Sequence, residues 1–123
     1  MSVLIKRAYA PAAAADGVRV LVDRLWPRGV KKAGAKFTAW MKDIAPSPKL
    51  RVWFGHKPER FKEFAVRYKK ELIGNPRVGE LRNLVRGRTV TLVYAARDPE
   101  VNHAVVLRSI LRRGTRRKRA ARG

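Results

Sequence analysis

Three short stretches of apolar and β-branched residues predict β-strands. Residues 2–7 and 18–22 interleave aliphatic side chains with basic ones, and the second stretch reads Val-Arg-Val-Leu-Val. Residues 89–94 form the clearest strand, because they are β-branched and apolar on both faces, as in a central parallel strand. Residues 37–44 fit either a helical face or an alternating strand, and we expect a short strand there.

Helical spacing of apolar residues occupies the second half of the chain. Ser47 followed by Pro48 predicts a helix start, since serine caps free amides and proline suits the first turn. That helix should run to about Phe54. Further helices are expected from about residue 58 to a stop at 74–76, over 76–86 and over 102–113.

Strands separated by helices predict an α/β fold, a small single-domain three-layer sandwich with a mainly parallel sheet and flanking helices. With 123 residues, the chain has the length of one domain. We expect this domain to cover residues 1–111. Residues 112–123 should form a disordered basic tail, because they have no acidic and no large apolar side chain.

The formal net charge of +21 makes polyanions possible partners. The tail holds seven of the 30 Lys and Arg residues and none of the 9 acids, so the folded body is also strongly basic. Such a domain attracts polyanions by counterion release. Two interpretations stay open: contact with nucleic acid in the cell, or incidental binding by a solvated basic face.

Composition and motifs exclude several kinds of chemistry. Without cysteine there is no disulfide, thiolate nucleophile or sulfur-ligated zinc site, and with two histidines we expect no metal and no cofactor. The chain has no Walker loop, no Gly-x-Ser-x-Gly and no Gly-x-Gly-x-x-Gly. No apolar run approaches the roughly 20 residues of a membrane span, so we expect no membrane contact and a cytoplasmic protein.

Polar residues follow the second and the last predicted strands. Asp23 and Arg24 come after the second strand and Asp98 after the last, so parallel neighbours would bring them to one rim of the sheet. Asp23 and Asp98 are candidate acid/base groups, while Arg24, Arg28 and Arg51 are candidate clamps for a phosphate or carboxylate. A structural ion pair within the turn explains Asp23 and its arginines equally well.

Five further residues are candidates for the same site. Trp26, in a loop beside a proline, is suited either to stacking on a base or to core packing. His56 and His103 are candidate ligand-binding and catalytic groups, with a hydrogen bond at a helix end as the alternative. His103 follows Asn102 at a helix N-terminus, where free amides attract anions, and Tyr94 closes the central strand.

Several motifs occur in a fixed order along the chain. They are residues 23–29, 40–47, 50–56, 94–98 and 102–104, together with Phe64, Tyr68 and Glu71. Together they resemble the YeaO-like branch of the DUF488 family. The resemblance runs from about residue 5 to about residue 111, and its tryptophan-rich motifs in this order make it specific. It implies a fold and a set of motif residues, and no activity.

These observations predict an anion-binding α/β domain that acts on or with nucleic acid or a nucleotide-like metabolite. Its partners would be nucleic acid or a phosphorylated small molecule. Whether it turns over a substrate stays open. The alternatives are a nucleic-acid-binding module without catalysis, in which the basic face supplies the affinity, and a regulatory protein that responds to a small anion.

Overall fold

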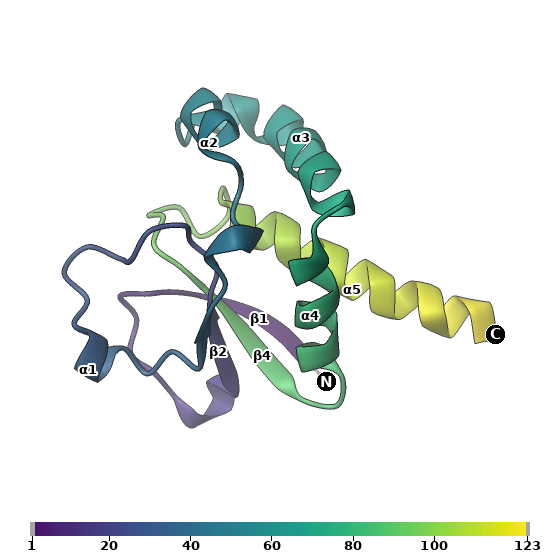
Figure 1. The fold of residues 1–123 in the computed structure, drawn as a ribbon, viewed down its shortest axis with the longest axis horizontal. Helices are drawn as coiled ribbons and strands as arrows, with labels where there is room; N and C mark the ends of the chain where they lie inside the picture. Colours follow the sequence, from purple (N-terminus) through teal and green to yellow (C-terminus); the bar gives the residue numbers. More distant parts are fainter. Residues whose placement is uncertain (1, 123) are drawn as a thin grey trace.

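The computed structural model describes the backbone of residues 2–122 and the side chains of residues 2–112 (Figure 1). Four parallel strands form its sheet, in the order β1-β4-β2-β3. The last strand in the sequence is therefore central, with β1 on one side and β2 on the other. The predicted α/β class with a parallel sheet is confirmed. The strands are β1 Ser2–Arg7, β2 Val18–Leu21, β3 Ala39–Trp40 and β4 Thr89–Tyr94.

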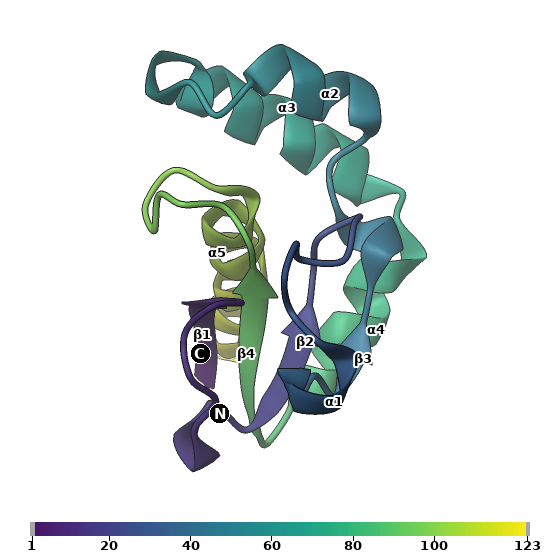
Figure 2. The same cartoon turned by 90° about the vertical axis from the view of Figure 1, so that its left-hand side faces the viewer.

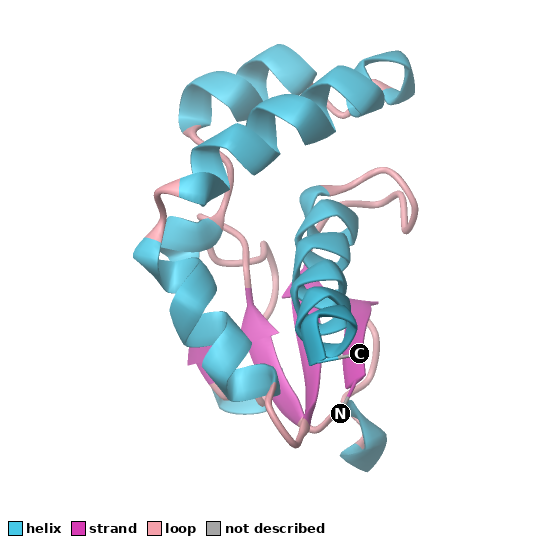
Figure 3. Cartoon of the chain, turned by 90° about the vertical axis from the view of Figure 1, so that its right-hand side faces the viewer, coloured by secondary structure: helices cyan, strands magenta, loops and turns pink. Residues whose placement is uncertain are grey.

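Two helices, α4 and α5, cover one face of the sheet (Figure 3). The one-turn helix α1 and the loop around it lie over the other face, so the third layer is thin (Figure 2). No helix in the described part of the chain is long and apolar enough to cross a membrane. The helices are α1 Lys32–Ala35, α2 Pro48–Phe54, α3 Phe61–Ile73, α4 Pro76–Val85 and α5 His103–Arg122.

One predicted strand is shorter in the structure. The strand expected over residues 37–44 is reduced to Ala39–Trp40 and is followed by a 3-10 turn, Lys42–Ile44, which ends the pairing with β2. The helical backbone of α5 continues to Arg122, while side chains are described only as far as residue 112, so the predicted domain boundary at residue 111 and the disordered tail 112–123 are not tested. They stay predictions.

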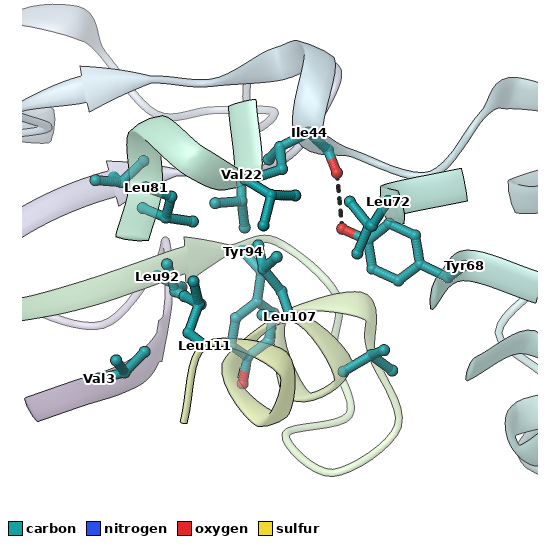
Figure 4. Packing of buried hydrophobic residues seen from close by; sticks show 14 of the residues in the cluster. Val3, Val22, Ile44, Tyr68, Leu72, Leu81, Leu92, Tyr94, Leu107 and Leu111 are labelled. Atoms are coloured by element: carbon teal, nitrogen blue, oxygen red, sulfur yellow. Dashed lines mark hydrogen bonds between the residues drawn. The ribbon is translucent and has the colours of Figure 1, made fainter. Parts of the chain in front are cut away.

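The main core lies between the sheet and the helices α4 and α5 (Figure 4). Val20 and Leu92 point into it from neighbouring strands, where Leu81 of α4 and Leu107 of α5 meet them, and all four are fully buried. Because strand side chains alternate between faces, Leu21 points the other way, into a smaller cluster under the loop.

Helices α2 and α3 form an arch, residues 48–73, that stands over the carboxyl ends of the strands (Figure 2). Ser47 caps α2 by accepting the amide of Leu50 at 3.2 Å, as its position before Pro48 predicts. The backbone amide and hydroxyl of Ser47 donate to Glu71 of α3 at 2.9 and 2.6 Å. These bonds fix the two helices of the arch to each other.

Tyr68→Phe is expected to lower the free energy of unfolding by about 1–2 kcal/mol, because a buried carbonyl loses its hydrogen bond. The hydroxyl of Tyr68, fully buried in α3, donates to the carbonyl of Ile44 at 2.7 Å (Figure 4). Tyr9→Phe is the matched control, since the Tyr9 hydroxyl makes an exposed bond to the carbonyl of Arg28. Urea denaturation of both variants measures the difference. Equal losses of unfolding free energy would show that the buried bond from Tyr68 to Ile44 contributes no more than the exposed bond of Tyr9.

Candidate functional site

A cavity of about 560 Å³ opens between the carboxyl edge of the sheet and the α2–α3 arch. This is where parallel sheets usually bind ligands, because loops after the strands converge there. Its volume is within the range of small-molecule sites, and its lining is mostly apolar. The lining residues are Asp23, Arg24, Leu25, Ala45, Pro46, Arg51, Phe54, His56, Phe64, Ala95, Ala96, Arg97, Asp98, Asn102 and His103.

Asp23 lies at the junction of β2, β4 and α5. Its Oδ2 accepts the backbone amide of Ala95, just after β4, at 3.0 Å. The Nε2 atom of His103, at the first position of α5, lies 3.0 Å from the carbonyl oxygen of Val22 and 3.2 Å from Asp23 Oδ1. With its hydrogen on Nε2, the ring can donate to the carbonyl, and the carboxylate oxygen lies beside the same nitrogen.

Asp23 and Arg24 each keep one polar atom without a hydrogen bond. Among the side chains that the structure describes, Asp23 Oδ1 and Arg24 Nε are the two buried polar atoms without such a partner. The Nη2 atom of Arg24 donates to the carbonyls of Ala45 and Pro46, both at 3.3 Å. A buried polar atom without a partner costs about 1–3 kcal/mol. Both residues line the cavity, but these two atoms are themselves covered from solvent, and His103 Nε2 lies 3.2 Å from Asp23 Oδ1.

Asp98 and Asn102 shape the loop that closes the cavity between β4 and α5. The Asp98 carboxylate accepts the amides of Glu100 and Val101 at 2.8 and 3.1 Å. Asn102 is fully buried, caps α5 by accepting the amide of Val105 at 3.0 Å, and donates to the carbonyl of Asp98. These are the bonds of a turn and a helix cap.

The exposed rim of the cavity is cationic. Arg51 reaches it from α2, and Arg97 reaches it from the loop after β4. His56 follows the C-cap Gly55 and has a φ of +58°, a left-handed backbone that is uncommon for residues other than glycine. Residues in such strained conformations cluster at binding sites, where the surrounding structure holds them in place.

Comparison with known proteins identifies the family. A family model described as the inactive DUF488-N3 subclade matches residues 2–123. An uncharacterized protein of Mycobacterium tuberculosis is 46% identical over 109 residues, which cover 89% of this chain and 92% of that protein. The uncharacterized protein YeaO of Escherichia coli is 40% identical over 113 residues, 91% of this chain and 98% of that protein. The chain belongs to the DUF488 family. No solved structure matches it.

The cavity of this DUF488 protein brings together most of the residues that the sequence singles out. They come from four separate segments, after β2, on α2, after β4 and at the start of α5. Their common position follows from the parallel register, which places the ends of β2 and β4 side by side. The seven residues are Asp23, Arg24, Arg51, His56, Asp98, Asn102 and His103.

Trp26 and Arg28 do not reach this cavity, contrary to the prediction. The loop after Asp23 folds across the opposite face of the sheet, where the Trp26 ring packs 5.3 Å from Phe37 and 5.5 Å from Trp40, between centroids. Its Nε1 donates to the carbonyl of Val30. Arg28 is exposed on the same loop. Trp26 therefore packs against other side chains, which is the alternative to stacking on a base.

Tyr94 also lies outside the cavity. As the last residue of β4 it faces α5, where it is 2% exposed and packs in the main core with Leu107 (Figure 4). Burial raises the pKa of Tyr94, and the nearby Arg7 and Arg108 oppose this effect. The hydroxyl therefore stays protonated at neutral pH, and strand alternation turns it away from the cavity.

Two core aromatics also form the wall of the cavity, a role that the sequence pattern did not indicate. Phe54 and Phe64 stack with ring centroids 4.2 Å apart, one at the end of α2 and the other on the inner face of α3. Their spacing indicates only that they are buried. Leu25 adds an apolar side chain that is 61% exposed.

The lining limits the chemistry that is available. It has no Ser, Thr, Cys, Tyr or Lys side chain that could act as a nucleophile. Within the described residues no group of three His, Asp or Glu side chains could hold a metal ion. What the cavity does offer is the side chains of Asp23, Asp98 and His103, a cationic rim and an aromatic wall.

Proposed function

We propose that this DUF488 protein is an anion-binding α/β domain of the cytoplasm that holds a nucleotide-like metabolite in the cavity and does not turn it over. One observation carries the proposal. The side chains of Arg51 and Arg97 are exposed at the rim of one cavity, whose wall is the stacked pair Phe54 and Phe64. Guanidinium groups above an aromatic wall suit a ligand with an anionic end and a planar body.

The anionic part of the ligand would lie at the rim. Arg51 and Arg97 are exposed there, and guanidinium groups bind phosphate through two parallel hydrogen bonds. Asp98 also lines the cavity, and two backbone amides donate to its Oδ1. The net charge of +21 would draw anions toward the protein over a longer range.

Two observations support binding without turnover. The matching family model is described as an inactive subclade. The lining has no hydroxyl, thiol or amine nucleophile. A second candidate is an enzyme in which His103 and Asp23 act as a general base pair, and the 3.2 Å contact between them favours it. Product formation from a bound nucleotide would decide for this candidate.

The double variant Arg51→Gln/Arg97→Gln is expected to weaken the binding of inorganic phosphate and of nucleoside monophosphates by about tenfold or more, because charge-assisted hydrogen bonds are lost. The matched control is Arg86→Gln/Arg88→Gln, which removes the same charge from exposed residues before β4, at the opposite edge of the sheet. Isothermal titration calorimetry at two salt concentrations measures both.

If the two double variants weaken anion binding equally, and if moderate salt abolishes that binding, the cavity is rejected as the anion site. It would leave general attraction of polyanions by the basic surface, which is the nucleic-acid-binding alternative.

A further inference from the structure

A second charged surface lies on the face of the sheet that α4 and α5 leave open, under the one-turn helix α1 and its loop (Figure 2). Residues 25–42 include five Lys and Arg side chains and no acid, and all five are exposed. We call this surface the aromatic-basic face, and none of its residues lines the cavity. It consists of Tyr9, Arg28, Lys31, Lys32, Lys36, Trp40 and Lys42.

Two aromatic rings of the aromatic-basic face are open to solvent. Tyr9, in the turn after β1, is 47% exposed, and Trp40 of β3 is 37% exposed. The Tyr9 hydroxyl donates to the carbonyl of Arg28 at 2.9 Å, and Trp40 Nε1 donates to the carbonyl of Asp23 at 2.7 Å. Both rings are therefore held in place before a ligand arrives, so stacking on them orders little additional structure.

Contacts between side chains join these rings to the cations around them. The half-buried Trp26 ring lies 5.5 Å from the Trp40 ring, between centroids, and belongs to the loop that holds Tyr9. Lys42 Nζ lies 4.8 Å from the Trp40 ring centroid, and Lys32 Nζ lies 5.8 Å from that of Trp26. Aromatic rings and cations are thus interleaved on one surface.

The cations of the aromatic-basic face have no carboxylate partners. The ion pairs of the described side chains lie elsewhere, at Asp16, Asp23, Glu63 and Glu80. Like charges so close together repel one another, and a bound polyanion relieves this repulsion. A basic stretch alone is typical of any solvated surface, but exposed aromatic rings anchored among the cations add a means of recognising bases.

We propose that the aromatic-basic face binds single-stranded nucleic acid. Unpaired bases stack on Tyr9 and Trp40, and the surrounding lysines and Arg28 neutralise the phosphates. A duplex fits this face less well, because its bases stack on each other. A membrane also fits less well, because α1 has a single turn and offers no amphipathic helix to enter the bilayer boundary. The inference does not depend on the function proposed for the cavity.

Matched ligands test the inference on the unmodified protein. The probe is a fluorescent oligothymidylate of about 12 nucleotides, a length within the usual site sizes. In fluorescence anisotropy at about 0.15 M salt, we expect it to bind about tenfold or more tightly than an abasic oligomer of the same length and charge. Unlabelled oligothymidylate should displace the probe more effectively than either a DNA duplex or phosphatidylglycerol vesicles.

Two substitutions that keep the charge test the aromatic rings. Tyr9→Leu and Trp40→Leu should each weaken the binding of oligothymidylate about fivefold or more and leave the binding of the abasic oligomer unchanged. Trp53→Leu is the matched control on α2, where Arg67 lies over the ring at 4.1 Å from its centroid, and it should change neither affinity. Urea denaturation checks that each variant folds. If Trp40→Leu does not fold, Tyr9→Leu, in an exposed turn, carries the test.

A double substitution tests the cations. Lys31→Gln/Lys32→Gln should weaken both oligomers and make the dependence of log affinity on log salt shallower by about 1.4, from two lost phosphate contacts. The matched control is Lys57→Gln/Lys62→Gln, which removes the same charge from exposed lysines of the α2–α3 arch and should leave that slope nearly unchanged.

Equal affinities for oligothymidylate and the abasic oligomer would overturn the inference, as would unchanged binding by the folded Tyr9→Leu and Trp40→Leu variants. More effective displacement by the duplex would also overturn it, and more effective displacement by the vesicles would assign the face to a membrane surface instead. The phosphate titrations of the Arg51 and Arg97 variants decide the function of the cavity separately.

Discussion

Asp16→Asn is expected to lower the free energy of unfolding by about 3 kcal/mol or more, because it leaves a buried guanidinium without its counter-charge. Asp16 Oδ2 lies 2.6 Å from Arg19 Nη1, and Asp16 Oδ1 lies 3.0 Å from Lys6 Nζ. Arg19 is 5% exposed, and its remaining side-chain bond goes to the carbonyl of Lys36. Urea denaturation at pH 7 measures the loss.

Glu63→Gln is the matched control for Asp16→Asn. It removes a carboxylate that pairs with Arg67 at 3.0 Å, where both side chains are about half exposed. An exposed pair of this kind contributes less than about 1 kcal/mol. Similar losses in the two variants would mean that the Asp16 pair is solvated in solution.

The pH dependence of the same variant follows from the pKa of Asp16. Burial raises this pKa, but the amide of Ala13 and the side chains of Lys6 and Arg19 together lower it by more. The net pKa of Asp16 therefore lies below its ordinary value of 3.8. The stabilisation from Asp16 is therefore fully present above about pH 4 and is lost as the pH falls through the lowered pKa. The stability difference between the native protein and Asp16→Asn should shrink over that acidic range.

Gly17→Ala is expected to destabilise the fold by about 3 kcal/mol or more, through a steric clash and backbone strain together. Gly17 has a φ of +64° and a ψ of −133°, a conformation open to glycine and strained for other residues. A Cβ atom there would lie 2.2 Å from the carbonyl oxygen of Thr89, at the start of the central strand. That backbone cannot move without disturbing the sheet. We expect urea denaturation of this variant to show a clearly lower midpoint, or expression to yield only insoluble protein.

Gly29→Ala separates the clash from the strain. Gly29 also has a positive φ, +82°, but a Cβ there would meet no atom within 4 Å. Its substitution should cost about 1 kcal/mol, from the backbone conformation alone. Equal effects at Gly17 and Gly29 would show that the approach of Thr89 does not constrain the turn.

Local pattern in the sequence determined most of the elements and some of the residues that end them. The β-branched run at 89–94 predicts β4 to the residue, and Ser47 with Pro48 predicts the start of α2, because strand alternation and helix capping depend on near neighbours. The rule that parallel strands end at one edge also assigns Asp23 and Asp98 to one rim on the strength of the strand pattern alone.

Tertiary structure decided which of those residues face one another. Asp16 and Gly17 directly precede β2 in the sequence, but only packing shows that Asp16 is buried against Arg19 and that Gly17 lies against Thr89. Trp26 follows Asp23 by three residues and still packs on the opposite face of the sheet, because the loop carries it across the edge to Phe37. The arch places Phe54 and Phe64 over the strand ends, which their helical spacing alone could not indicate. Periodicity reports which side of an element is apolar, whereas the partner of that side depends on contacts between residues far apart in the chain.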